Sequence, residues 1–102
     1  MAFRTLTIGR RRDADIRLAD RSVSRVHAEV TMTGDGRYFL IDCGSLRGTW
    51  TRTGNGEWVR HRQGYVEAAS RVRLGRLETQ LKELEPLTVT HRRRLGAERM
   101  ER

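Results

Sequence analysis

Two short stretches of this 102-residue chain place basic and hydroxyl side chains in a pattern suited to holding a phosphate group. The first is Gly9-Arg10, which follows the strand-like run 5–8. A glycine lets the backbone turn sharply after a strand, so that the Arg10 guanidinium projects outward, free for a bidentate contact with phosphate. In the second stretch, Ser24 supplies a hydroxyl donor and Arg25 a second positive charge. A phosphothreonine, which carries about −1.5 to −2 near neutral pH, would be attracted by both loops.

A third stretch, from residue 42 to residue 49, reads Asp-Cys-Gly-Ser-Leu-Arg-Gly-Thr. Gly44 and Gly48 bracket a tight loop between two strand-like runs. Exposed loop backbone of this kind can meet an extended peptide next to the phosphorylated residue. The residues predicted to face the peptide are Ser45, Leu46, Arg47 and Gly48.

These loops need a scaffold, and the hydrophobic pattern predicts that it consists of short strands. Apolar and polar residues alternate from Val26 to Met32 and again from Leu77 to Leu81. Alternation with a period of two indicates strands that are buried on one face. Glycine-rich turns such as 34–36 and 54–56 separate the runs, and no segment before residue 90 shows a sustained helical stripe. We therefore predict an all-β sandwich or barrel.

Composition narrows the class of protein further. The net charge is +8, and all but one of the 21 basic residues are arginines, whose planar fork grips phosphate or carboxylate. This favours an anionic partner, although an arginine-rich genome would also spread such residues over a solvated surface. No uncharged stretch approaches the roughly 20 apolar residues that cross a bilayer, so the expected location is cytoplasmic.

Neither a metal site nor an enzyme is expected. The three histidines lack metal-ligand spacing, and no cofactor motif such as a nucleotide-binding P-loop is present. Ser24 and His27 are not framed by the Gly-x-Ser-x-Gly elbow of a hydrolase. The single cysteine, Cys43, ends the apolar run 38–43 and is predicted to be a small buried strand residue.

The composition changes after Pro86, the only proline. We expect one compact domain over residues 1–86. Residues 87–102 would hold a strand remnant at Leu87 and Val89, followed by a basic tail that is a short helix or disordered, because Gly96 weakens a helix and few apolar residues remain.

The stretch Thr7 to Glu78 resembles a forkhead-associated (FHA) domain in the order of five short motifs. These are Gly9-Arg10, Asp13-Ala14-Asp15-Ile16-Arg17-Leu18, Ser24-x-x-His27, Gly44-Ser45-x-x-Gly48-Thr49 and Val72-Arg73-Leu74-Gly75. The resemblance implies a β-sandwich of about eleven strands, whose apical loops bind phosphothreonine peptides.

The resemblance also implies roles for single residues. Arg10 and Ser24 match the family's phosphate contacts, and Arg25 matches a neighbouring position that often touches phosphate as well. His27 matches a histidine that braces the binding loops through hydrogen bonds. The residues expected to support the loops are then Gly9, His27 and Thr49. The implied partner is a phosphothreonine-containing protein, such as a Ser/Thr kinase or its substrate.

The chain departs from the family pattern at one point. Where the family usually has a hydroxyl residue followed by asparagine before Gly-Thr, this sequence has Leu46 and Arg47. Leu46 has no side-chain donor, and Arg47 cannot reproduce an amide that both donates and accepts hydrogen bonds. We hypothesise that Arg47 instead adds charge near the phosphate or selects an acidic peptide residue.

Two alternatives to phosphopeptide binding remain open from the sequence. The departure at residues 46 and 47 suits a degenerate FHA scaffold that docks an unphosphorylated protein. The net charge and the run His91-Arg92-Arg93-Arg94 suit nucleic-acid binding. Against nucleic acid, aromatic residues are scarce, and Trp50 and Trp58 lie in strand-like runs where packing on the sheet is favoured over base stacking.

Overall fold

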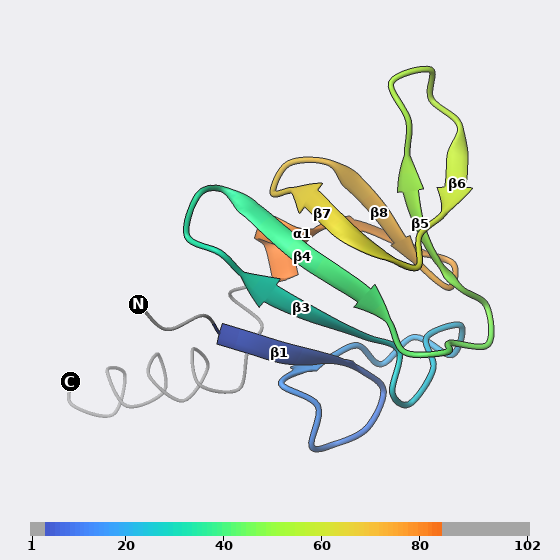
Figure 1. Ribbon diagram of the computed structural model, residues 1–102. Coiled ribbons are helices and arrows are strands. Elements are labelled where there is room, and N and C mark those ends of the chain that lie inside the picture. The colour runs from blue at the N-terminus through green and yellow to red at the C-terminus, as the bar shows by residue number, and fades with distance from the viewer. Residues whose placement is uncertain (1–3, 85–102) are drawn as a thin grey trace, which may run out of the picture.

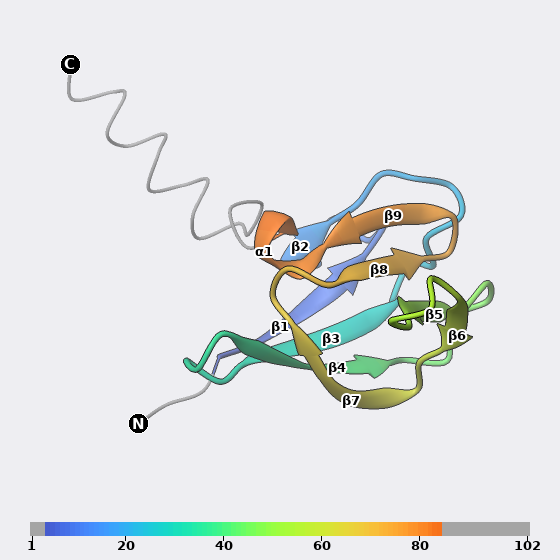
Figure 2. The same cartoon turned by 90° about the horizontal axis from the view of Figure 1, so that it is seen from above.

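The structure is a computed structural model that describes residues 4–84, and these residues form two β-sheets stacked face to face (Figures 1 and 2). The elements are β1 (Arg4–Gly9), β2 (Ile16–Arg17), β3 (Ala28–Met32), β4 (Arg37–Asp42), β5 (Thr49–Arg52), β6 (Trp58–Arg60), β7 (Gln63–Glu67), β8 (Arg71–Leu74), β9 (Leu77–Gln80) and α1 (Leu81–Leu84).

The first sheet has the strand order β2-β1-β3-β4-β7, and the second has the order β6-β5-β8-β9. All neighbouring strands pair antiparallel except β1 and β2, which pair in parallel. The register pairs Leu6 with Val30 and Val30 with Leu40, so that these three apolar side chains form one row. Because side chains alternate between the faces of a strand, this register directs one whole face of the sheet into the core.

The core lies between the two sheets. Ile8, Leu40 and Leu74 are fully buried there, and Val23 joins them from the segment between β2 and β3. Val72 and Leu74 face inward from β8, so Arg71 and Arg73 must point to the outer side of the second sheet. The predicted all-β sandwich is confirmed, and the described residues form nine strands where the resemblance implies about eleven.

Two of the alternating apolar runs extend beyond the strands that contain them. Val26 is 46% exposed, and β3 begins only at Ala28, because the backbone of residues 24 and 25 is hydrogen-bonded to the loop after β1 and not to a ladder. At the other end, Leu81 does not continue β9 but begins α1. Leu81 and Leu84 are three residues apart and both buried, which places them on one face of a single helical turn. One turn is too short to show a helical stripe in the sequence.

Cys43 differs from its predicted position as well. It follows β4 and is only half-buried, and its backbone N–H donates to the carbonyl of His27 at 2.9 Å. Partial burial, with Glu29 and Asp42 nearby, raises the pKa of its thiol above the ordinary 9.0.

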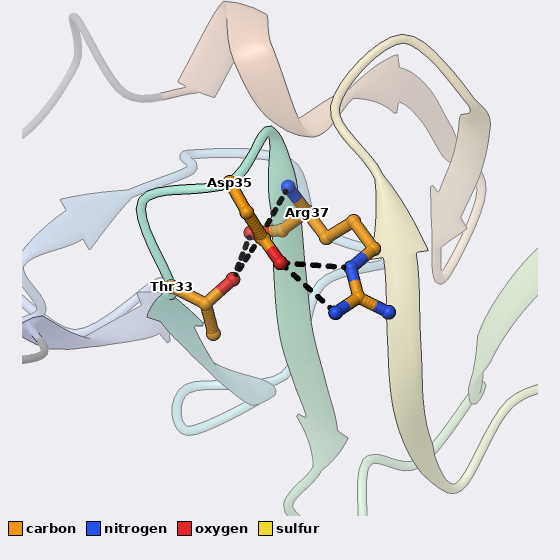
Figure 3. A network of polar contacts seen from close by, with 3 residues as sticks. All are labelled: Thr33, Asp35 and Arg37. Atoms are coloured by element: carbon orange, nitrogen blue, oxygen red, sulfur yellow. Dashed lines mark hydrogen bonds and ion pairs between the residues drawn. The ribbon is translucent and has the colours of Figure 1, made fainter.

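The turn between β3 and β4 is closed by a compact polar network (Figure 3). The Thr33 hydroxyl oxygen lies 2.5 Å from the Asp35 carboxylate and 2.9 Å from the carbonyl oxygen of Arg37, two acceptors that share its one proton. The Arg37 guanidinium donates to the same carboxylate at 2.9 Å and lies over the ring of Tyr65 on β7, 4.4 Å from its centroid. Hydrogen bonds from Thr33 and then Arg37 lower the pKa of Asp35 to about 2. The charges of Asp35 and Arg37 in this turn are therefore paired with each other.

No helix between residues 4 and 84 is long and apolar enough to cross a membrane. The predicted strand remnant at Leu87 and Val89 and the basic tail to residue 102 lie outside the described residues, and the domain boundary after residue 86 stays a prediction.

Candidate functional site

Three loops meet at the end of the sandwich where β1 and β4 finish (Figure 1). The loop after β1 is joined to the segment before β3 by two backbone hydrogen bonds, from Arg10 N–H to the Ser24 carbonyl at 3.1 Å and from Arg11 N–H to the Arg25 carbonyl at 3.2 Å. The loop after β4 joins the same segment through the Leu46 N–H, which donates to the Ser24 hydroxyl oxygen at 2.9 Å. The predicted meeting of the loops is therefore present in the fold.

The Arg10 side chain is exposed, and its guanidinium is fixed at one atom. Its Nε donates to the carbonyl of Val23 at 2.5 Å. Within residues 4–84 its terminal nitrogens have no protein partner. This hydrogen bond orients the plane of the guanidinium and leaves two nitrogens, with their N–H groups, open for a bidentate contact with an anion.

The Ser24 hydroxyl is prepared as a donor by the loop after β4. Its oxygen accepts the Leu46 N–H, and a hydroxyl that accepts at one lone pair still has its own proton to donate. Ser24 is half-buried, and in the described part of the chain its Oγ has no other hydrogen-bond partner. The O–H is thus available to a ligand oxygen beside Arg10.

The Leu46 side chain itself is 86% exposed. The departure from the family pattern at this position therefore changes the exposed side chain, whereas the backbone contact to Ser24 remains. Arg47 is also exposed, and its carbonyl accepts the indole N–H of Trp50 at 3.0 Å.

Arg25 lies on a different part of this surface. It lines a cavity of about 140 Å³ together with Arg11, Asp13 and Val26. Arg10 and Ser24 do not line that cavity. The structure therefore brings Arg10 and Ser24 together, while Arg25 stands beside them as an exposed charge.

Gly9 supports the loops, though for a different reason from the predicted sharp turn. Its φ is not positive, and a Cβ at this position would stand 2.1 Å from the carbonyl oxygen of Arg25. A glycine is therefore needed because the backbone of the segment before β3 passes directly against it.

His27 is fully buried and connects two of the loops. Its Nδ1 accepts the Ser24 N–H at 2.9 Å, and its Nε2 lies 3.0 Å from the Gly48 carbonyl oxygen. A carbonyl can only accept, so the imidazole must be neutral with its proton on Nε2. Burial lowers the pKa of His27 below the ordinary 6.5, outweighing the hydrogen bond to Gly48, which raises it.

Asp42 organises the third loop, a role that the sequence reasoning missed. Its carboxylate accepts the N–H groups of Gly44 and Ser45 at 3.1 and 3.2 Å. It also accepts the hydroxyls of Ser45 at 2.5 Å and of Thr49 at 2.7 Å. Burial raises the pKa of Asp42, but these hydrogen bonds outweigh burial and leave the pKa below the ordinary 3.8. An aspartate followed within three residues by glycine and serine is an Asx-turn signal that could have identified it.

Two of the residues predicted to face a peptide are buried instead. The Ser45 side chain is 6% exposed, because its hydroxyl is directed to Asp42. Gly48 is buried with a φ of +87°, and its carbonyl accepts from both His27 and the Gly75 N–H. Leu46 and Arg47 are then the solvent-facing part of this loop. Thr49 is fully buried, and its hydroxyl donates to Asp42.

A β-sandwich that holds an arginine and a serine hydroxyl open on braced loops defines a small binding domain whose site lies outside its core. The match to the FHA domain family covers residues 6–75, and the chain belongs to this family.

Similar proteins were found by sequence and by structure. The oxoglutarate dehydrogenase inhibitor of Corynebacterium jeikeium (strain K411) is 50% identical over 46 residues, which are 45% of this chain and 31% of that protein. This chain therefore spans under a third of the curated relative that it matches.

Among solved structures, the FHA domain of the CT664 protein from Chlamydia trachomatis aligns with a TM-score of 0.62 at 30% identity, covering 74% of this chain and 71% of that one. A structure from an analysis of phosphothreonine-dependent FHA domain interactions aligns with a TM-score of 0.60 at 32% identity, covering 76% and 75% of the two chains.

The buried, neutral His27 predicts a pH dependence of stability. The unfolded histidine takes up a proton near pH 6.5 whereas the folded one does so only at lower pH. The stabilisation is therefore fully present above pH 6.5 and lost as the pH falls below it. The free energy of unfolding, measured with urea at pH 7.5 and 5.5, should decrease on acidification in the wild type and less so in His27→Gln. His61→Gln, which alters a half-buried histidine on the β6–β7 connection, serves as the control and should keep the full decrease. An equal decrease in the free energy of unfolding in all three proteins would contradict the conclusion that His27 is buried in its neutral form.

The Asp42 network predicts a local loss of order. In Asp42→Ala, four donors of the loop lose their acceptor, so the free energy of unfolding should fall by roughly 1.5 to 3 kcal/mol or more. Amide hydrogen exchange at residues 44 to 49 should accelerate. Asp13→Ala, which removes an exposed carboxylate paired only with Arg11, should leave both measurements nearly unchanged.

Proposed function

We propose that this domain is a binding module, not an enzyme, and that it recognises phosphothreonine in a partner protein. Arg10 and Ser24 hold the phosphate, and Leu46 and Arg47 contact the residues beside it. The observation that carries the proposal is the juxtaposition of an open guanidinium with an oriented hydroxyl. The Arg10 N–H is bonded to the Ser24 carbonyl, and both side chains are accessible.

The chemistry of this pair fits a phosphate monoester. The terminal nitrogens of Arg10 can grip two phosphate oxygens, and the Ser24 hydroxyl can donate to one of them or to the third. Arg25 and Arg47 add exposed positive charge around the pair. A phosphoryl group near neutral pH carries enough charge and enough acceptor oxygens to satisfy all these donors.

Membership of the FHA family supports this function. The aligned structure from the analysis of phosphothreonine-dependent FHA interactions shares 32% of its aligned sequence with this chain. We propose that the partner here is a Ser/Thr kinase or a protein that such a kinase modifies. The braced loops also support phosphate dependence over a degenerate scaffold, because the backbone N–H of Leu46 prepares Ser24 whatever side chain residue 46 carries.

Arg10→Ala should abolish most of the binding to a phosphothreonine peptide. Loss of a charge-assisted contact costs on the order of 1.5 to 3 kcal/mol, which is roughly a tenfold to more than hundredfold weaker Kd. Fluorescence anisotropy with a degenerate phosphothreonine library measures this. The matched control is Arg4→Ala, which removes the same charge from the opposite end of β1 and should change Kd little.

The unphosphorylated form of each peptide completes this experiment. Equal binding with and without phosphate would sink the proposal in favour of a scaffold function. Strong binding to an oligonucleotide with a steep salt dependence, and none to the peptides, would favour nucleic-acid binding instead.

A further inference from the structure

The outer face of the second sheet carries alternating arginine and tryptophan side chains. The Arg60 guanidinium lies over the Trp50 ring, with its Cζ 5.5 Å from the ring centroid. Arg73 lies between the two indoles, 5.3 Å from the Trp50 centroid and 4.9 Å from that of Trp58. Arg52 lies 5.8 Å from the Trp58 centroid. We name these five residues the arginine–tryptophan ladder.

Strand register creates the ladder. Trp50 of β5 is paired with Arg60 of β6 on one side and with Arg73 of β8 on the other, and Arg52 is paired with Trp58. Directly paired residues lie on the same face of a sheet, and residues two apart on a strand share that face. The opposite face of β8 contributes the buried Val72 and Leu74 to the core, so the ladder faces away from the core.

The three guanidinium groups of the ladder have no carboxylate partner. In residues 4–84 the ion pairs are those of Arg11, Arg37 and Arg71. Arg52 and Arg60 are exposed, and Arg73 is half-buried with its Nε buried and without a hydrogen-bond partner. Three like charges thus stand on one surface, ordered by the indole faces. The Arg52 Nε–H donates to the Gly56 carbonyl at 3.1 Å, and the other guanidinium nitrogens of the three arginines have no hydrogen-bond partner among residues 4–84. Glu78 of β9 is paired with Arg73 in register and shares this face, but its carboxylate is ion-paired with Arg71. A further carboxylate is therefore the ligand that the three ladder arginines lack.

The indoles are already covered by guanidinium groups. Trp50 packs against two arginines and Trp58 against two, and both rings are half-buried. Their faces are therefore not free as platforms for nucleobases, which single-strand binding proteins require. An anion would instead meet the edges of the guanidinium groups, where carboxylates bind in a planar fork.

The ladder is continuous with the loop after β4. The Trp50 indole N–H donates to the Arg47 carbonyl at 3.0 Å. A Cβ on Gly48 would stand 2.8 Å from Arg60 Nε, so the Arg60 side chain lies directly against that loop. A chain that leaves the candidate phosphate site past Arg47 would therefore meet Arg60 first, and Arg73 lies on the other side of the Trp50 ring.

From this continuity we propose that the arginine–tryptophan ladder docks an acidic segment of the partner, rich in Asp or Glu and located close in sequence to the phosphothreonine. This inference rests on the proposed function and extends it, because it makes recognition bipartite. Arg10 and Ser24 bind the phosphate, and the ladder binds acidic side chains of the flanking chain.

The experiment compares phosphothreonine peptides that differ only in their flanks. A pair of aspartates is moved stepwise through about eight positions on either side of the phosphothreonine, a reach of roughly 27 Å in extended chain, and matched peptides carry asparagines. We expect one window of positions at which aspartates tighten Kd by about three- to tenfold, as partly exposed ion pairs can. The double variant Arg52→Gln/Arg60→Gln should lose that gain and still bind the asparagine peptide as tightly as the wild type.

The control Arg4→Gln/Lys82→Gln removes the same charge from outside the ladder and should retain the gain. A single variant, Arg60→Glu, should reverse the preference and favour a lysine pair in the same window, which a merely unstable protein would not do. If no window exists, or if the control loses the gain equally, the ladder proposal is overturned while the phosphate site stands. If an oligonucleotide competes through Arg52 and Arg60 and the acidic flank does not, it is likewise overturned. If the asparagine phosphopeptide itself fails to bind, the proposed function falls first and the ladder proposal falls with it.

Discussion

The end of this domain at which the three loops meet depends on one buried side chain that is polar but uncharged. The His27 ring accepts from the Ser24 backbone and donates to the Gly48 carbonyl, so a single imidazole fixes the spacing between the segment before β3 and the loop after β4. Both bonded groups are backbone groups of loops, which no sheet ladder satisfies. Without the ring the Ser24 N–H would lose its acceptor at a partly buried position, which costs up to about 1 to 3 kcal/mol, whereas the Gly48 carbonyl would keep only the hydrogen bond from the Gly75 N–H. His27 thus holds the loops in place from the core side, and their solvent-facing side stays open.

His27 links two loops to each other, and Asp42 links the residues within the loop after β4. The carboxylate gathers two backbone N–H groups and two hydroxyls, so the residues that look most polar in the sequence are turned inward. The hydroxyls of Ser45 and Thr49 are buried in this network, whereas Leu46 and Arg47 are exposed to solvent. Which side chains of this loop face solvent is therefore set by the hydrogen bonds to the Asp42 carboxylate, and not by side-chain polarity alone.

The sequence predicted the architecture well because alternation is a property of every strand. The burial of Val30 on the inner face of its strand follows directly from it. The motif around Arg10, Ser24 and His27 likewise predicted which residues meet. What could not be predicted is set by contacts between distant segments. Val26 continues the alternating pattern of β3, yet it lies before the strand begins. The residues that precede it are held by the backbone of Gly9 and Arg10: Arg10 N–H donates to the Ser24 carbonyl, and the Arg25 carbonyl packs against Gly9. Ser45, which was expected to face a peptide, is turned inward by a hydrogen bond to Asp42, a residue to which the sequence analysis gave no role. The arginine–tryptophan ladder needs the register of β5, β6 and β8, which no local pattern encodes.

The Leu46 N–H that donates to Ser24 has a wider implication. Because the contact is made by the main chain, almost any residue except proline can stand at position 46 without disturbing the serine. Its side chain projects into solvent and contributes little to folding. A substitution at position 46 would therefore change the exposed surface beside Ser24 and still keep the main-chain hydrogen bond to the serine hydroxyl.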